Sequence, residues 1–233
     1  MAKSPIDVIV RMLSSDAPER QLAAVIVLGE LEHKKAVPEL TGMLPAAPPT
    51  LQRHVLEALA RIGLGSRALA PVWPLCASRD PEVRRAASEA IAAVGEGVIG
   101  EGQARLGAAE GDERRALEGI LSRLGGAEAF DVLLAALADG DEESNRATAL
   151  ELRRHVKDAD AKTRRGYRGR LEKFLKRDLP VPARAAAVKV LGYLEDPATA
   201  PTLMALAQDR AGAPAVRQEA LIALRFTLAE GGA

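Results

Sequence analysis

A short sequence motif recurs along the chain at nearly constant spacing, and this repeat limits the fold more than any other feature. It is clearest at 83–95, 183–194 and 216–224. One large aliphatic residue marks the same place in every copy: Leu28, Leu59, Ile91, Leu121, Leu152, Leu191 and Leu224. Successive anchors lie 31, 32, 30, 31, 39 and 33 residues apart. Such a period is typical of solenoids, in which each copy is one supersecondary unit that stacks on its neighbours.

Each copy is predicted to form two antiparallel α-helices. Apolar residues recur at helical spacing, and no segment alternates with the period of two that a strand requires. Helix starts carry capping signals, such as the acidic N-cap Asp80 followed by Pro81 in the first turn. We therefore predict an all-α superhelix, a single domain over 1–233, with about six two-helix units and a half-unit at each end. The predicted units are 1–15 (cap helix), 16–46, 47–78, 79–110, 111–140, 141–178, 179–211 and 212–233 (cap helix).

The motif resembles the short bacterial HEAT-like repeats first noted in phycobilisome lyases. The resemblance rests on the pattern Val-Arg-x-x-Ala-Ala-x-Ala-Leu-Gly-x-Leu-Gly, present in pieces at 83–95 and 183–194, and on Ala-Val-Pro-x-Leu at 36–40. It covers nearly the whole chain. It implies a right-handed superhelix of helix pairs in which the second helices line a concave surface. Because the shared positions record packing, the resemblance specifies a fold and leaves the function open.

An arginine recurs in the first turn of three copies, at Arg84, Arg184 and Arg217. We expect these arginines to pair with aspartate or glutamate of the loop between units. Exposed pairs of this kind contribute about 0–1 kcal/mol each, so their predicted role is structural.

Composition excludes several classes of protein. Lys+Arg and Asp+Glu both number 32, so the formal net charge is zero and the chain is not a basic coat protein for nucleic acid. The single cysteine, Cys76, cannot build a disulfide framework or a cysteine-ligated metal site. No apolar run approaches the roughly 20 residues of a membrane span, and the stretch 6–13 lacks the features of a secretory signal. We therefore expect a cytoplasmic bacterial protein that binds no membrane.

The sequence predicts no catalytic residue, no metal ligand and no cofactor. The three histidines, His33, His54 and His155, lie in different copies and share no metal-ligand spacing. Glycines at 95–100 match a dinucleotide-binding pattern, but that pattern requires a preceding strand, and helical sequence precedes it here. Deoxyhypusine hydroxylases, which are HEAT-like enzymes, carry repeated His-Glu pairs, and this chain has none. No small-molecule substrate is predicted.

The fifth unit, 141–178, departs most from the shared pattern. Between 153 and 177 it carries eleven Lys or Arg residues and three acidic residues, a local net charge of 11 − 3 = +8. A helix through this run exposes part of the charge to solvent, where it can meet phosphates or acidic side chains. The predicted partner-binding residues are Arg153, Arg154, Arg164, Arg165, Tyr167, Arg168, Arg170 and Lys173, with the only tryptophan, Trp73, as a second candidate site.

We predict a non-catalytic scaffold or adaptor that binds an acidic segment or domain of a partner protein on the concave face. The alternative is a nucleic-acid-binding protein that uses the same basic patch, with Tyr167 stacking on a base. A third interpretation is a subunit of a lyase or of another enzyme. Two structural interpretations stand beside these: the basic run is only a solvated helix face, and Trp73 packs in the core instead of anchoring a partner.

Overall fold

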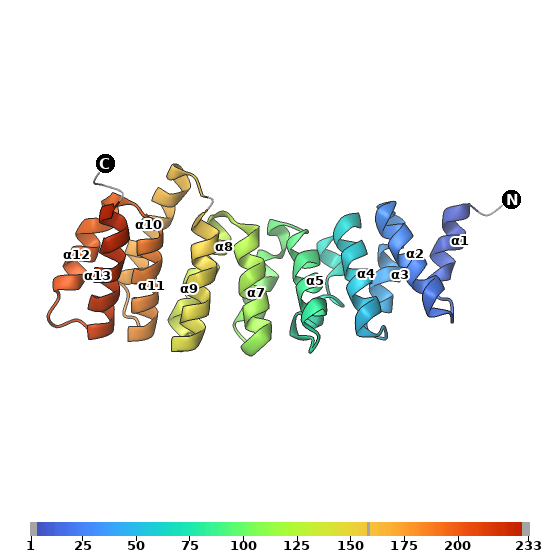
Figure 1. Ribbon diagram of the computed structural model, residues 1–233, viewed down its shortest axis with the longest axis horizontal. Coiled ribbons are helices and arrows are strands. Elements are labelled where there is room, and N and C mark those ends of the chain that lie inside the picture. The colour runs from blue at the N-terminus through green and yellow to red at the C-terminus, as the bar shows by residue number, and fades with distance from the viewer. Residues whose placement is uncertain (1–3, 158, 230–233) are drawn as a thin grey trace. The chain divides into compact units, whose positions relative to one another are not determined.

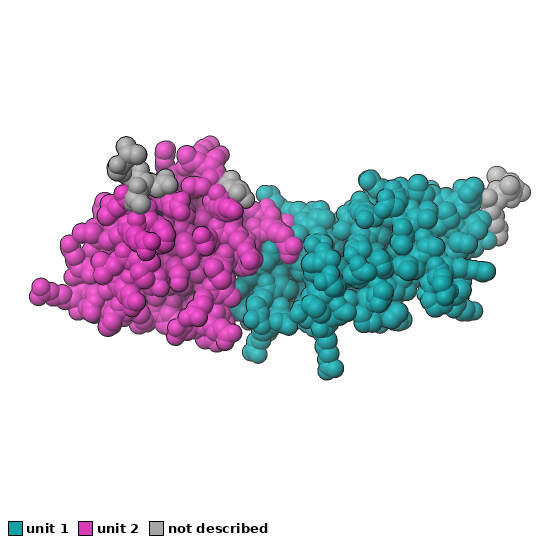
Figure 2. Space-filling model, viewed as in Figure 1, with its two compact units in different colours: residues 1–120 teal, residues 121–233 magenta. Residues whose placement is uncertain are grey.

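The computed structural model describes residues 4–157 and 159–229. Over these residues the chain forms thirteen α-helices and five short 3-10 helices, with no strand (Figure 1). The prediction of an all-α solenoid is therefore confirmed. The chain divides into two compact units, and the division falls within one helix (Figure 2). We call Met1–Ile120 the first unit and Leu121–Ala233 the second unit, and we keep "repeat unit" for the predicted copies of the motif. The prediction of a single domain stays a prediction.

The helices fall into two alternating sets. First-row helices are α2 (Pro18–Glu30), α4 (Pro49–Ile62), α5 (Pro81–Ala92), α7 (Gly111–Leu124), α9 (Glu142–Lys157), α11 (Val181–Tyr193) and α13 (Pro214–Ala229). Second-row helices are α1 (Pro5–Met12), α3 (Val37–Met43), α6 (Ile99–Leu106), α8 (Gly126–Asp139), α10 (Ala161–Leu175) and α12 (Ala200–Gln208). The 3-10 helices are η1 (Lys34–Ala36), η2 (Ser66–Ala68), η3 (Trp73–Ala77), η4 (Glu96–Val98) and η5 (Pro197–Thr199).

Packing follows one rule in both units. Within each compact unit first-row helices pack on one another: α2 on α4 and α4 on α5 in the first unit, α9 on α11 and α11 on α13 in the second. Five second-row helices pack on the first-row helix that follows them: α1 on α2, α3 on α4, α8 on α9, α10 on α11 and α12 on α13. The anchor residues Leu28, Leu59, Ile91, Leu121, Leu152 and Leu191 are buried along the first row. Their regular spacing in the sequence thus reflects one packing position that each repeat fills again.

The fourth residue of a first-row helix ties that helix to the segment before it. Gln52 Nε2 donates a hydrogen bond to the Leu44 carbonyl oxygen at 2.9 Å, and Asn145 Nδ2 donates to that of Gly140 at 3.0 Å. Arg84, Arg184 and Arg217 occupy the same position. They donate to the carbonyl oxygens of Ser78, Leu175 and Arg210 at 2.7, 3.0 and 3.1 Å.

This arrangement corrects the expectation that the arginines pair mainly with acids. Carbonyl groups at the end of a helix have no partner within the helix, so a nearby long-chain donor satisfies them. Of the three arginines, Arg84 also lies near an acid, with Nη2 3.5 Å from Asp112. The structural role of these arginines is therefore to bond the backbone of the connecting segment.

Two of the predicted repeat units depart from the expected pair of regular helices. In 47–78 the second helix is replaced by η2 and η3, because Pro71 and Pro74 lack the amide hydrogen that an α-helix needs there. In 141–178 both helices are long: α9 has 16 residues and α10 has 15, whereas the second-row helix α3 has 7. The longer α10 accounts for the 39-residue gap between anchors and carries most of the basic run.

Candidate partner-binding surface

Helix α10 is held in place by its ends and by its apolar side. Asp160 caps its start and accepts a hydrogen bond from the Thr163 amide at 2.7 Å. That hydrogen bond, aided by the nearby Lys162 ammonium, lowers the pKa of the Asp160 carboxyl below its ordinary value. On one side of the helix Tyr167, Leu171, Phe174 and Leu175 are buried. The opposite side is therefore presented to solvent in a fixed orientation.

That solvent side carries four cations in a row with one glycine. We name these five residues the α10 cationic face: Lys162, Arg165, Gly169, Lys173 and Lys176. Successive members are 3, 4, 4 and 3 residues apart, the spacing of one helix face, and all five are exposed. None of the four cations forms an ion pair with a residue of 4–157 or 159–229. The middle of the row is open, because nothing lies within 4 Å of the position that a Gly169 Cβ would occupy.

Other basic residues of the run already have partners inside the second unit. Arg164 donates to the carbonyl oxygens of Lys157 at 2.9 Å and Ala159 at 3.0 Å, in the way that Arg84 and Arg184 serve their own helices. Arg168 pairs with Asp196 at 2.7 Å, and Arg170 with Asp131 at 2.9 Å. These three arginines consolidate the fold.

The remaining predicted residues divide in the same manner. Arg153 lies over the Tyr193 ring, 5.1 Å from its centroid, and Arg154 pairs with Glu151. Of the predicted set, only Arg165 and Lys173 belong to the α10 cationic face. Lys162 and Lys176 complete it and were not in the predicted set, although their 3- and 4-residue spacing from Arg165 and Lys173 is visible in the sequence.

Tyr167 does not lie on a binding surface, which corrects its predicted role. It is buried, and its ring stacks on Phe130 with the ring centroids 4.1 Å apart. His155 Nε2 lies 3.0 Å from the Tyr167 hydroxyl and 2.9 Å from the Gly126 carbonyl oxygen. Because a carbonyl oxygen only accepts, we assign the hydrogen to Nε2, which leaves the buried Nδ1 without a hydrogen-bond partner. Phe130 of the fourth repeat unit thus forms a buried aromatic cluster with His155 and Tyr167 of the fifth.

This cluster predicts a pH dependence of stability. Burial lowers the pKa of His155 below its ordinary value of about 6.5, although the backbone carbonyls of Gly126 and Ser122 favour the protonated ring. The unfolded chain therefore takes up the proton at a higher pH than the folded protein does. Stability is full above about pH 6.5 and falls as the pH decreases below that value towards the folded-state pKa. Urea unfolding at a series of pH values measures this decrease.

The matched control is His155→Leu, which places at this position the residue type found at Leu194, the residue that follows α11. Its free energy of unfolding at neutral pH reflects the lost hydrogen bonds, but its slope between pH 7 and 5 should be shallower than that of the wild type. All other ionisable groups are the same in the two proteins, so the difference in slope belongs to His155. Equal slopes would contradict the prediction.

Trp73 is also buried, with 1% of its surface exposed, so the interpretation as a core residue is right and that as a partner anchor is wrong. It lies at the start of η3, which packs on α5. The Arg105 guanidinium lies 5.0 Å from the centre of its ring. Cys76, in the same 3-10 helix, is buried as well.

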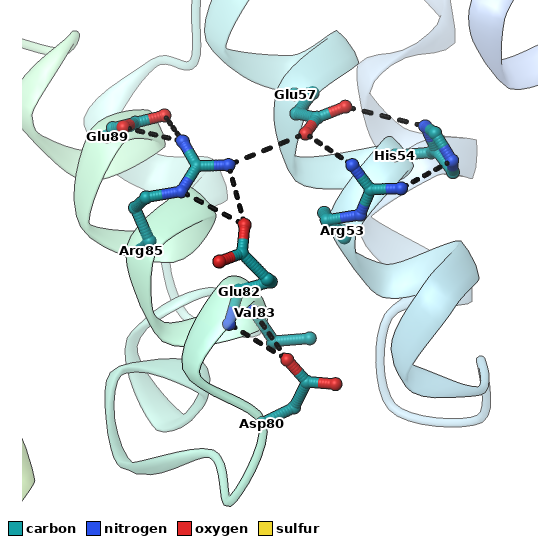
Figure 3. A network of polar contacts seen from close by, with 8 residues as sticks. All are labelled: Arg53, His54, Glu57, Asp80, Glu82, Val83, Arg85 and Glu89. Carbon is teal, nitrogen blue, oxygen red and sulfur yellow. Dashed lines mark hydrogen bonds and ion pairs between the residues drawn. The ribbon is translucent and has the colours of Figure 1, made fainter.

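The first unit has a charged surface whose charges compensate each other (Figure 3). On α4, Glu57 accepts from Arg53 at 3.3 Å and lies 3.4 Å from His54 Nδ1. On α5, Arg85 pairs with Glu82 at 3.0 Å and Glu89 at 2.8 Å, and it also reaches Glu57 at 3.9 Å. Every cation drawn there has an acidic neighbour, which is the opposite of the α10 cationic face.

No group of three or more His, Cys, Asp or Glu side chains in 4–157 and 159–229 is placed to hold a metal ion. Over the same residues, no helix has the length and hydropathy needed to cross a membrane.

Comparison with solved structures finds helical repeat proteins of low sequence identity. Human deoxyhypusine hydroxylase in complex with glycerol is 21% identical, over 97% of this chain and 86% of that chain, with a TM-score of 0.44. The complex of CpcE and CpcF of phycocyanin lyase from Nostoc is 16% identical, over 98% and 96%, with a TM-score of 0.46. A designed armadillo repeat protein is 17% identical, over 95% and 99%, with a TM-score of 0.40. At these levels the likeness concerns the fold alone.

No curated protein matches the chain. The family model of HEAT repeats matches residues 6–95 and 170–230, which together are more than half of the sequence. These segments contain the first-row helices α2, α4, α5, α11 and α13, whose anchor residues defined the repeat. On this match and on the alternating helix rows, the chain belongs to the HEAT repeat family.

Proposed function

We propose that the protein is a non-catalytic scaffold or adaptor that holds an acidic segment of a partner protein against the α10 cationic face. The observation that carries the proposal is a row of four exposed cations that form no ion pair with any residue of 4–157 or 159–229, on a chain whose net charge is zero. Neighbouring arginines such as Arg168 and Arg170 have acidic partners in the second unit. The unpaired cations are therefore a local excess on one helix face, which steers and orients an acidic ligand.

The geometry of this face suits an extended or helical acidic segment. Lys162 and Lys176 are fourteen residues apart, which corresponds to about 21 Å along a helix. Because α10 is anchored through its buried side, binding requires little ordering of the scaffold, and this favours affinity. Glycine inside a helix costs about 1 kcal/mol relative to alanine, so the open surface at Gly169 has a stability cost that close approach of a partner would explain.

A protein ligand is favoured over nucleic acid by the position of the aromatic residues. Binding of single strands commonly combines cations with aromatic rings on which bases stack. Tyr167, the aromatic residue of α10 that was expected to stack, is buried against Phe130. The α10 cationic face itself contains no aromatic residue. Electrostatic contact between these cations and carboxylates of the ligand is therefore the main expected contribution to binding.

Affinity capture from native lysate at near-physiological salt tests the proposal. The test variant is Arg165→Glu/Lys173→Glu/Lys176→Glu. The control is Arg20→Glu/Lys34→Glu/Lys35→Glu, which reverses the same number of exposed charges in the first unit. We expect a protein that is captured in stoichiometric amount by the wild type and the control but lost with the test variant. Lysine cross-linking of the wild-type complex should join that protein to Lys162, Lys173 or Lys176.

A neutral substitution separates direct contact from long-range attraction. Gly169→Leu leaves every charge in place and favours the helix, but it fills the open middle of the face. We expect it to reduce capture of the same protein. Equal capture by wild type and charge-reversal variant would mean that the face is only solvated, and loss of nuclease-sensitive material instead of a protein would replace the proposal with nucleic-acid binding.

A further inference from the structure

The last first-row helix, α13, leaves uncovered a position that is buried in the repeats before it. The position is the eighth residue of the helix. In α2, α4, α5, α9 and α11 this residue is 3% exposed or less: Val25, Leu56, Ser88, Ala149 and Val188. In α13 it is Leu221, which is 60% exposed, and Leu228 two turns later is 59% exposed. We name Leu221, Arg225 and Leu228 the α13 end face.

The repeats themselves show what covers such a face. At the twelfth residue of α2, a Cβ on Gly29 would lie 2.9 Å from Ala58 Cβ, and Ala58 is the tenth residue of the next first-row helix, α4. The same relation joins Gly192 of α11 to Ala223 of α13, with 2.7 Å between the two Cβ positions. A first-row helix therefore uses one side for the helix after it and a different side, including its tenth residue, for the helix before it.

That second side is exposed at the other end of the repeat array. The tenth residue is buried in α4, α5, α11 and α13, as Ala58, Ala90, Val190 and Ala223. In α2 it is Val27, which is 39% exposed, and Leu31 one turn later is 57% exposed. We name Val27 and Leu31 the α2 end face. Since the two sides of a first-row helix differ, the α13 end face matches the α2 end face and does not match itself.

Arginine within the α13 end face does not prevent this packing. Helix α9 has the same arrangement in the interior of the second unit, with Ala149, Arg153 and Val156 at the positions of Leu221, Arg225 and Leu228. Ala149 and Val156 are buried although α9 carries this arginine. Helix α11 still packs on α9, because Arg153 turns aside over the Tyr193 ring. Arg225 likewise lies over the neighbouring Phe226 ring, at 5.7 Å from its centroid.

We propose that the protein associates head to tail with a second copy of itself, so that the α13 end face of one copy packs on the α2 end face of the next. The contact continues the spacing of the repeats from one chain into the other. Such a contact is heterologous, so each copy keeps one free end and further copies can add as a ring or an open chain. This association is independent of the α10 cationic face.

Two single substitutions and their mixture test the proposal. Leu221→Glu blocks the α13 end face and Leu31→Glu blocks the α2 end face, both at exposed positions that the fold tolerates. Sedimentation velocity should show that the average mass of the wild type rises with concentration beyond that of a dimer. Each variant alone should remain monomeric. An equimolar mixture should form one-to-one dimers and nothing larger, because the two intact faces meet once.

Leu150→Glu is the matched control, since Leu150 is an exposed leucine of α9 outside both end faces, and it should associate as the wild type does. Far-ultraviolet circular dichroism checks that all variants are folded. A wild type that stays monomeric at every concentration would overturn the proposal. So would unimpaired association of Leu31→Glu alone, because that result would mean that α13 end faces bind each other.

Discussion

Replacing Trp73 with alanine is expected to lower the free energy of unfolding by about 3–5 kcal/mol. The indole is almost fully buried, so truncation removes a large apolar side chain and leaves a cavity in the first unit. The surrounding segment has little capacity to close that cavity, because η3 is short, contains Pro74 and packs on α5. The Arg105 guanidinium also loses the ring over which it lies.

Urea unfolding followed by far-ultraviolet circular dichroism measures this loss without relying on tryptophan fluorescence. The control is Leu150→Ala, because Leu150 is a large apolar residue on the surface, and its replacement should change the free energy of unfolding by about 0.5 kcal/mol or less. If Trp73→Ala behaved like the control, the core assignment would be wrong and Trp73 would again be a candidate partner anchor.

The helical repeat could be predicted because packing positions return in the sequence at the period of the structure. The anchors from Leu28 to Leu191 record a packing position that each repeat fills in the same way, and Asp80 caps α5 as the sequence predicts. The prediction of two α-helices was wrong where one repeat contains residues that its neighbours lack. In 47–78, two prolines prevent a second α-helix, and 3-10 turns form instead. The motif of the neighbouring repeats predicts an α-helix there, so it does not indicate this difference.

Which basic residues are available to a partner could be predicted only in part. Periodicity shows which residues share a face of α10, and it groups Lys162, Arg165 and Lys173 correctly. It does not show which faces meet other helices, because that depends on contacts such as those of Arg168 with Asp196 and of Arg170 with Asp131. These partners are 28 and 39 residues away in the sequence, so no local pattern marks them.

The burial of Tyr167 has the same explanation. When only the basic run is considered, an aromatic residue within it is predicted to lie at the surface. The cluster that buries it consists of Phe130 from α8 and His155 from α9. His155 lies three residues after the anchor Leu152, where Leu194 follows Leu191 in the next repeat, and in the structure this replacement of an aliphatic residue accompanies the nearby aromatic pair. The departure from the repeat at His155 therefore indicates a change in core packing. The exposed cations lie on α10, on the side of that helix opposite to Tyr167.

One chemical change made at two glycines should shift stability in opposite directions. Gly169→Ala adds a methyl group where nothing lies within 4 Å, so only the higher helix propensity of alanine acts, and stability should rise by about 1 kcal/mol. Gly192→Ala adds a methyl group 2.7 Å from Ala223 Cβ and 2.9 Å from Ala223 Cα. Helices α11 and α13 must then separate, and we expect a loss of about 1–3 kcal/mol despite the gain in propensity.

A double substitution shows whether the close approach of the two helices is the cause. In Gly192→Ala/Ala223→Gly the methyl group moves from one helix to the other, so the 2.7 Å contact between the two Cβ positions is removed, whereas the 2.9 Å approach to the Cα of residue 223 remains and α13 acquires a glycine. Free energies of unfolding for the wild type, both single variants and the double variant form a cycle whose interaction energy should favour the double variant by about 1 kcal/mol or more. Additive effects would instead mean that Gly192 is not needed for helix packing. The expected result would show that the small residue at the twelfth position of α11, Gly192, sets the distance between α11 and α13.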